Sequence, residues 1–230
     1  MNGRIGMSPD WQRDIFGNFH SRDFMGTKAH SGFYGFYEDV RKALEQYQRI
    51  NGLYDVGRNK VLITGHSLGA AGANLLAAYL SHDESLAYKS NIYCYTFATP
   101  NCVLQKGARL HDFGNVFNVV NPKDGVTGLP TNLMEGFGLF GPSTAKAWKY
   151  GVVCAIPSDD RSGIGLDYDG CMRKFANELI SLLGSGFDDP HKLSGYLLKA
   201  DHHDPIMYMA WMKAKVPLAK ESSPGRYGAF

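Results

Sequence analysis

Apolar residues follow two kinds of pattern along this chain. Short runs rich in β-branched and aromatic residues predict buried strands at 61–64, 91–98 and 115–120. Apolar residues at helical spacing predict helices at 32–51, 70–80, 102–113, 170–183 and 204–215. In the first helix the recurring apolar positions are Phe36, Val40, Leu44 and Tyr47. Glycine and proline repeatedly interrupt the pattern over 131–161, which predicts irregular structure there.

The alternation of strands and helices implies an α/β fold, with a mainly parallel central sheet and helices on both faces. The chain has 230 residues, which suits a single domain over 1–230 with a full apolar core. The last helix is expected to begin at Asp204-Pro205, because aspartate caps helix N-termini and proline fits the first helical position.

Composition narrows the classes of function. The formal net charge is +2, and no Lys/Arg stripe suggests nucleic-acid binding. No run is apolar and long enough for a transmembrane helix. Residues 1–10 lack the apolar core of a signal peptide, so a cytoplasmic location is the default unless a longer N-terminus carried a leader. Cys94, Cys102, Cys154 and Cys171 show no zinc-site spacing; free thiols are expected, and one disulfide stays open as the alternative.

The strongest local signal is Gly65-His66-Ser67-Leu68-Gly69, which directly follows an apolar strand and directly precedes an Ala/Leu-rich helix. This is the setting of a nucleophile elbow, a sharp turn that presents a reactive serine at the top of a sheet. We expect Ser67 to have a strained backbone and to lie at the positive end of the following helix. A Cβ at Gly65 or Gly69 is expected to collide with the neighbouring strand or helix.

Several segments, in their order and spacing, resemble class 3 lipases, a family of α/β-hydrolases. They are the acidic-aromatic stretch 10–15, the His-x-Gly-Phe segment 29–34, the elbow 64–70, and the strand-and-acid segments 95–100 and 118–126. The resemblance covers about Asp10 to Tyr208. It implies the α/β-hydrolase fold and ester hydrolysis through an acyl-enzyme.

Asp124 is the expected acid of a catalytic triad. A serine is a weak nucleophile unless a histidine takes its proton and an acid orients that histidine, and α/β-hydrolases carry these groups in the order Ser, acid, His. Asp124 follows the predicted strand 115–120, at the sheet edge where ligands gather, and falls on the acid of the family. The alternative interpretation is that Asp124 only caps the 122–125 turn.

The histidine of the triad must lie downstream of Asp124, where the candidates are His191, His202 and His203. His203 precedes the last helix and has Tyr208 a few residues on, as the resemblance requires, whereas His202 and His191 are the alternatives. His66 is expected to point away from its neighbour Ser67 and to pack or hydrogen-bond within the elbow. The resemblance gives His30 a structural role near the site.

An oxyanion hole requires two hydrogen-bond donors. The backbone N–H of Leu68 is expected to be one of them. In the family the second comes from an Arg-Gly-Thr-like segment upstream of the Asp-Trp stretch, and here only residues 1–9 precede Asp10-Trp11, with a weak match at Arg4-Ile5-Gly6. We therefore expect either an N-terminal truncation that removes the first strand of the fold, or a donor supplied from elsewhere.

Two apolar segments bear on the substrate. The position of the family's lid is occupied by Trp11, Ile15, Phe16, Phe19, Phe24 and Met25, which predict either a lid or a surface helix packed on the core. Residues 136–141 alternate glycine with apolar residues and predict an acyl pocket or a buried loop. These features favour a lipase that acts on acylglycerols, with transient contact to a lipid interface and no metal or organic cofactor.

Three other interpretations remain open at the level of sequence. The first is a truncated homologue that is weak or inactive. The second is an enzyme with different acyl chemistry, such as a feruloyl esterase, an acyltransferase or a thioesterase. The third is a lipid-binding module without turnover.

Overall fold

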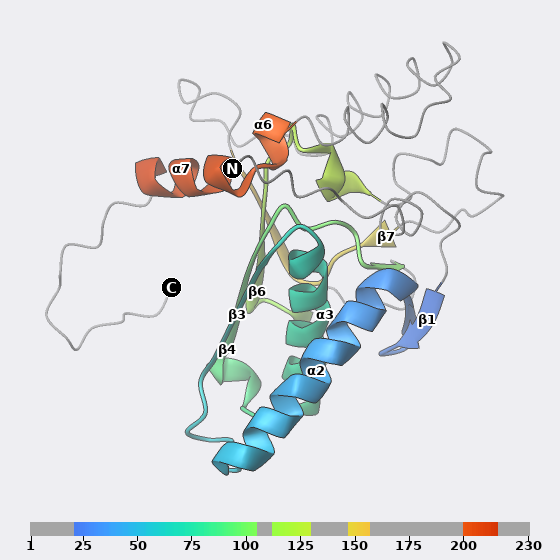
Figure 1. Cartoon of the computed structure of the whole chain (residues 1–230), viewed down its shortest axis with the longest axis vertical. Coiled ribbons are helices and arrows are strands. Elements are labelled where there is room, and N and C mark those ends of the chain that lie inside the picture. The colour runs from blue at the N-terminus through green and yellow to red at the C-terminus, as the bar shows by residue number, and fades with distance from the viewer. Residues whose placement is uncertain (1–20, 105–111, 130–146, 157–199, 216–230) are drawn as a thin grey trace, which may run out of the picture.

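A computed structural model of the chain describes residues 21–104, 112–129, 147–156 and 200–215 (Figure 1). The predictions for 1–20, for 170–183 and for 136–141 lie outside these residues, as do His191 and Cys171. Cys94, Cys102 and Cys154 are free thiols. Within the described part of the chain, no helix combines the length and the hydropathy needed to span a bilayer.

The centre of the fold is a parallel sheet in the order β3-β4-β6-β8. Its strands are β3 (Val61–His66), β4 (Ile92–Phe97), β6 (Val116–Val120) and β8 (Val152–Ala155). The three predicted strands are therefore confirmed, and a fourth lies in the region predicted to be irregular. Because all four strands run in the same direction, the segments that follow them meet at one edge of the sheet.

One face of this sheet is covered by α3 (Leu68–Asp83), which is itself covered by α2 (Ser31–Asn51); Figure 1 shows the two helices on the same side of the strands. Both helices were predicted. The buried residues of α2 are Phe33 and Tyr37, however, whereas Phe36 and Tyr47 of the predicted stripe are exposed. The fully buried residues of α2 lie in its N-terminal half, while in its C-terminal half Leu44 is partly buried and packs against the core.

On the opposite face of the sheet, the described residues provide only partial cover. α7 (Pro205–Lys215) packs Tyr208 and Trp211 against the last row of side chains on this face, which includes Phe97 and Val119. In the rows below, the exposed apolar residues are Leu62 at 71%, Tyr93 at 47%, Tyr95 at 41% and Val152 at 45%, while Phe117 is half-buried and stacks on Tyr95. Strand alternation and register place these residues on one face. Part of the sheet thus presents apolar side chains to solvent.

A second, antiparallel sheet was not predicted. It has the order β1-β2-β5-β7, formed by β1 (Ser21–Phe24), β2 (Thr27–His30), β5 (Val103–Leu104) and β7 (Ala147–Trp148). Two earlier expectations are therefore wrong. Val103–Leu104 is a strand and not part of a helix, and Phe24 is buried in the core at 5% exposure and is not in a lid. Met25 is the first residue of the tight hairpin turn, with φ 46°, and packs against the core.

Residues 147–155 pass from the small sheet into the large one. The crossing occurs at Lys149, Tyr150 and Gly151, between β7 and β8. Gly151 has φ +88°, and a Cβ there would lie 2.2 Å from the carbonyl oxygen of Val116, so only glycine fits this close approach. The remaining short elements are the 3₁₀ helices η1 (Lys89–Asn91) and η3 (Gly125–Gly128), and α6 (Ala200–His203).

Candidate active site

Ser67 occupies the turn between β3 and α3. Its φ of 56° and ψ of −123° lie where L-residues are strained, as predicted for an elbow. Its N–H donates to the carbonyl of Phe97 at 3.0 Å, which ties the turn to the neighbouring strand. A Cβ on Gly65 would lie 2.3 Å from the carbonyl oxygen of Gly69, so the expected collision is confirmed there. At Gly69 it is wrong, since no described atom lies within 4 Å of an added Cβ.

Asp124 follows β6, and its side chain is buried. Its Oδ1 accepts a hydrogen bond from the N–H of Val126 at 3.0 Å, so it does cap its turn as the alternative interpretation held. Its Oδ2 also accepts from the Tyr208 hydroxyl at 2.9 Å and lies 2.9 Å from Nδ1 of His203. Capping the turn and contacting the histidine are therefore compatible roles, because the carboxylate has enough lone pairs for both.

His203 lies at the end of α6 and joins the other two residues. Its Nε2 is 2.8 Å from Ser67 Oγ, and its Nδ1 faces the Asp124 carboxylate. An ionised carboxylate can only accept hydrogen bonds, so Nδ1 carries the hydrogen and Nε2 presents a lone pair to the serine hydroxyl. The geometry brings together Ser67, Asp124 and His203, while His202 offers its backbone carbonyl to Asn121 Nδ2 at 3.2 Å.

The side chain of His66 is not part of the hydrogen bonds that join Ser67, His203 and Asp124. Its Nε2 donates to the backbone carbonyl of His203 at 2.8 Å, and the two rings are 4.9 Å apart. Burial, followed by the charge of the neighbouring His203 ring, lowers the pKa of His66. A neutral His66 therefore holds α6 against the sheet edge, in line with the expected hydrogen-bonding role. His30 is buried in the core beside Phe33, with ring centroids 4.6 Å apart.

Leu68 is the first residue of α3, where backbone N–H groups lack partners within the helix. That is the position from which an oxyanion donor would act. The segment from which a second donor was expected lies outside the described residues. Within the described ranges, no group of three or more His, Cys, Asp or Glu side chains could hold a metal ion.

Sequence reasoning named Tyr208 only as part of the resemblance and gave Asn121 and Lys149 no role. Asn121 and Tyr208 hold the acid and the histidine, since the Tyr208 hydroxyl also accepts from the N–H of Asn121 at 3.0 Å. Lys149 is buried beneath the turn of Asp124. A lysine within the apolar run Ala147-Trp148-Lys149-Tyr150 was the available signal, because lysine is rarely buried without partners.

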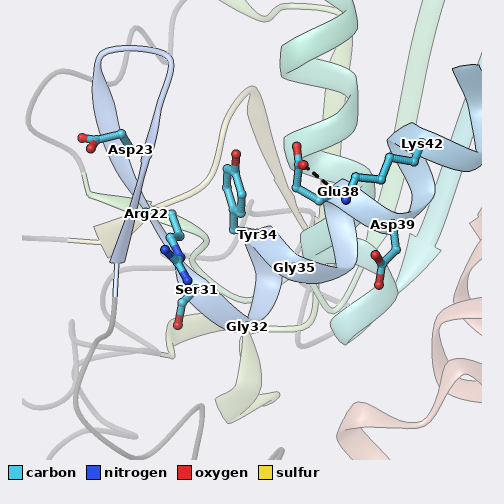
Figure 2. A pocket seen from close by; sticks show the side chains of 9 residues that line it. All are labelled: Arg22, Asp23, Ser31, Gly32, Tyr34, Gly35, Glu38, Asp39 and Lys42. Atoms are coloured by element: carbon cyan, nitrogen blue, oxygen red, sulfur yellow. Dashed lines mark ion pairs between the residues drawn. The ribbon is translucent and has the colours of Figure 1, made fainter.

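A pocket of about 580 Å³ lies between β1 and the first half of α2 and includes no member of the Ser67–His203–Asp124 group (Figure 2). Charged side chains dominate its lining: Arg22 and Asp23 come from β1, and Glu38, Asp39 and Lys42 come from α2. Such a lining does not suit an apolar acyl chain.

A strained serine turn that follows a strand of a parallel sheet and directly precedes a helix is the arrangement found in the α/β-hydrolase fold. The chain belongs to the lipase (class 3) family, whose model matches residues 7–134. The predicted fold class and the family resemblance are thereby confirmed.

Solved structures similar to this chain are fungal and other lipases. A structure described as a triacylglycerol lipase whose catalytic centre is a serine protease triad is 25% identical, with a TM-score of 0.50, over 72% of this chain and 61% of that one. The lipase of Rhizopus microsporus var. chinensis is 24% identical, with a TM-score of 0.47, over 63% of this chain and 48% of that one. The Rhizomucor miehei triacylglyceride lipase is 29% identical, with a TM-score of 0.40, over 54% of this chain and 47% of that one.

The match therefore spans about half to three fifths of the length of these lipases. A search of curated proteins found no match to the chain.

Proposed function

We propose that this protein hydrolyses carboxylic esters with apolar acyl chains, as a lipase acting on acylglycerols, through a triad of Ser67, His203 and Asp124. The single observation that carries the proposal is the hydrogen-bonded series from Ser67 Oγ to His203 Nε2 and from His203 Nδ1 to Asp124. Membership of the lipase (class 3) family supports the class of substrate. We also propose that residues 1–230 act as one α/β-hydrolase domain.

In the first half of the reaction, Ser67 Oγ bonds to the ester carbonyl carbon while His203 Nε2 takes the hydroxyl proton. Asp124 stabilises the imidazolium that forms, and the N–H of Leu68 donates to the oxyanion. The tetrahedral intermediate then collapses, the bond to the alkoxy group breaks, and His203 returns the proton to the leaving alcohol. Ser67 is left esterified by the acyl group.

In the second half, a water molecule attacks the acyl-serine carbonyl and gives a proton to His203. The intermediate collapses to release the carboxylic acid, and the proton returns to Ser67 Oγ. The side chain of His203 keeps 13% of its surface accessible while that of Asp124 is fully buried, as expected if the imidazole faces the substrate and the acid faces the core. The sequence of steps requires no metal or organic cofactor.

The proposal is tested by covalent labelling with a fluorophosphonate and by hydrolysis of p-nitrophenyl esters of increasing acyl length. Ser67→Ala is expected to abolish both signals, because no other described hydroxyl contacts His203 Nε2. Ser81→Ala is the matched control, since Ser81 lies near the far end of α3 and bonds to Asn115. Labelling that persists in Ser67→Ala would show that Ser67 is not the nucleophile.

A weak or inactive homologue is the alternative outcome of the same experiment. Well-folded wild-type protein that hydrolyses the esters only at the background rate would favour it. Losing one oxyanion donor lowers turnover by roughly 10²–10³-fold, so an incomplete oxyanion hole would appear as a loss of this size against a related lipase measured in parallel.

A further inference from the structure

Lys149 carries a buried ammonium group that none of the steps above uses. It lies in the crossing between β7 and β8 and is 1% exposed. An ammonium group removed from water is very costly unless acceptors and negative charge surround it. The partners of Lys149 therefore indicate what the residue does.

Its hydrogen bonds join two loops at the carboxyl edge of the parallel sheet. Lys149 Nζ donates to the carbonyl of Thr99 at 2.8 Å and to the carbonyl of Thr127 at 2.7 Å. Thr99 lies in the loop after β4, and Thr127 lies in η3, which begins directly after Asp124. One side chain thus fastens the turn of the acid to the end of the neighbouring strand.

The charge of Lys149 also acts on the acid. Burial lowers the pKa of Lys149 to about 8, while the charges of Cys102 and Asp124 act in the opposite direction. Lys149 is therefore mainly protonated at neutral pH and interacts favourably with the Asp124 carboxylate.

The turn of Asp124 has other connections to the same loop. Asn101 donates its N–H to Leu129 at 2.6 Å and its side-chain amide to Gly128 at 3.1 Å. Both contacts lie at the end of the turn farthest from Asp124 in sequence. Thr127 is the residue before Gly128, but it also donates its N–H and its hydroxyl to the carbonyl of Asp124, at 3.2 and 2.8 Å. A shift of Thr127 after the loss of Lys149 would therefore be passed to Asp124.

We propose that Lys149 is a positioning residue for the triad: its buried ammonium group holds the Asp124 turn against the loop after β4 and so keeps the carboxylate in register with His203. The proposal rests on the function proposed for Asp124. Lys149 does not touch the substrate, so its effect must pass through the acid and the histidine.

The test compares Lys149→Met with wild type in the full chain. Methionine has a similar length and an apolar chain, but it removes the charge and the hydrogen bonds to Thr99 and Thr127. We expect kcat for a p-nitrophenyl ester to fall about tenfold to a hundredfold, because small displacements of a catalytic group cost this much, while KM changes by less than about twofold. The downfield proton resonance of a histidine Nδ1–H shared with a carboxylate should be present in wild type and broadened in the variant.

Lys123→Met is the matched control, because it removes the same charge one residue before the acid, from an exposed side chain. It should keep the kcat and the proton resonance of wild type. The proposal is overturned if a cooperatively folded Lys149→Met keeps kcat within about twofold of wild type, or if Lys123→Met loses as much. Should Lys149→Met fail to fold, Lys149→Gln, whose amide still donates a hydrogen bond, is judged by the same criteria.

Ser67→Ala, measured in parallel, distinguishes a failure of the proposed function from a failure of the role proposed for Lys149. Activity that persists in Ser67→Ala contradicts the proposed function itself. Activity that is lost in Ser67→Ala but unchanged in Lys149→Met contradicts only the role of Lys149.

Discussion

At the scale of single residues, the site is defined by side chains that serve more than one partner. Asp124 caps its own turn, accepts from Tyr208 and faces His203. Such a carboxylate has few free orientations, because each hydrogen bond restricts rotation about the side chain. The histidine is fixed in the same way through its backbone, since His66 donates to its carbonyl. The structure thus positions the reactive groups through neighbours that do no chemistry themselves.

His66 makes stability depend on pH in a direction that can be worked out. Its pKa is lowered in the folded protein, mainly by burial, so the unfolded chain binds a proton more readily. The contribution of neutral His66 is fully present above the unfolded value of about 6.5 and is lost as pH falls below it. We expect the free energy of unfolding in urea to decrease less between pH 7.5 and pH 5.5 in His66→Gln than in wild type.

His82→Gln is the matched control for this comparison, because His82 is exposed near the end of α3. An equal loss of stability on acidification in wild type and in His66→Gln would contradict the assignment.

At the scale of elements, the elbow depends on one close approach and not on two. Gly65 sits directly against the backbone of Gly69, whereas no described atom stands near an added Cβ on Gly69 itself. The two glycines of the motif therefore differ, although the sequence pattern treats them alike. Backbone atoms cannot move aside as a flexible side chain can, so a side chain at Gly65 would strain the backbone of the whole turn.

The pair Gly65→Ala and Gly69→Ala tests this difference. Gly65→Ala should lower the free energy of unfolding by about 1–3 kcal/mol, as expected for overpacking. Gly69→Ala should leave it unchanged or raise it by up to about 1 kcal/mol, because alanine is favoured over glycine in a helix. Urea denaturation of both variants measures the effect, and a similar loss in both would show that the second glycine also lacks space.

The elements in which apolar residues form a clear run or recur at a regular spacing could be predicted from the sequence. The strands around Ile63, Cys94 and Val116 are apolar runs, and α2 and α3 have helical spacing. The β1–β2 hairpin has only four residues a strand and little alternation, and Val103–Leu104 is shorter still, so neither gave a pattern. Order along the chain limited the histidine of the triad to His191, His202 and His203, and the family resemblance favoured His203. The contacts of Lys149 and Tyr208 join residues distant in sequence, and no local pattern encodes such contacts.

At the scale of the whole molecule, the two faces of the parallel sheet have different environments. Ile63 and Leu62 are neighbours on β3, yet Ile63 is 8% exposed on the side of α3 and Leu62 is 71% exposed on the other side. The apolar rows around Tyr93 and Tyr95 extend this open area. A parallel sheet is normally covered on both faces, so this open area distinguishes the described structure from the usual arrangement.

Leu62→Glu and Ile63→Glu together report whether the second face is open in solution. Ile63→Glu should abolish cooperative unfolding or cost several kcal/mol, because it buries a carboxylate. Leu62→Glu should change stability by no more than about 0.5 kcal/mol, as for other surface substitutions. The measurement is the midpoint of thermal unfolding. A loss for Leu62→Glu as large as that for Ile63→Glu would mean that this face is covered in the intact protein.

The bond between Ser67 and His203 joins residues 136 positions apart, and the contact of His66 with His203 spans 137. The bonds within the parallel sheet close much shorter loops, such as that between β3 and β4. Because closing longer loops costs more entropy, we expect a refolding chain to pair its strands before α6 and α7 dock. Reactivity of the serine would then return last, so it is a stricter sign of complete folding than secondary structure.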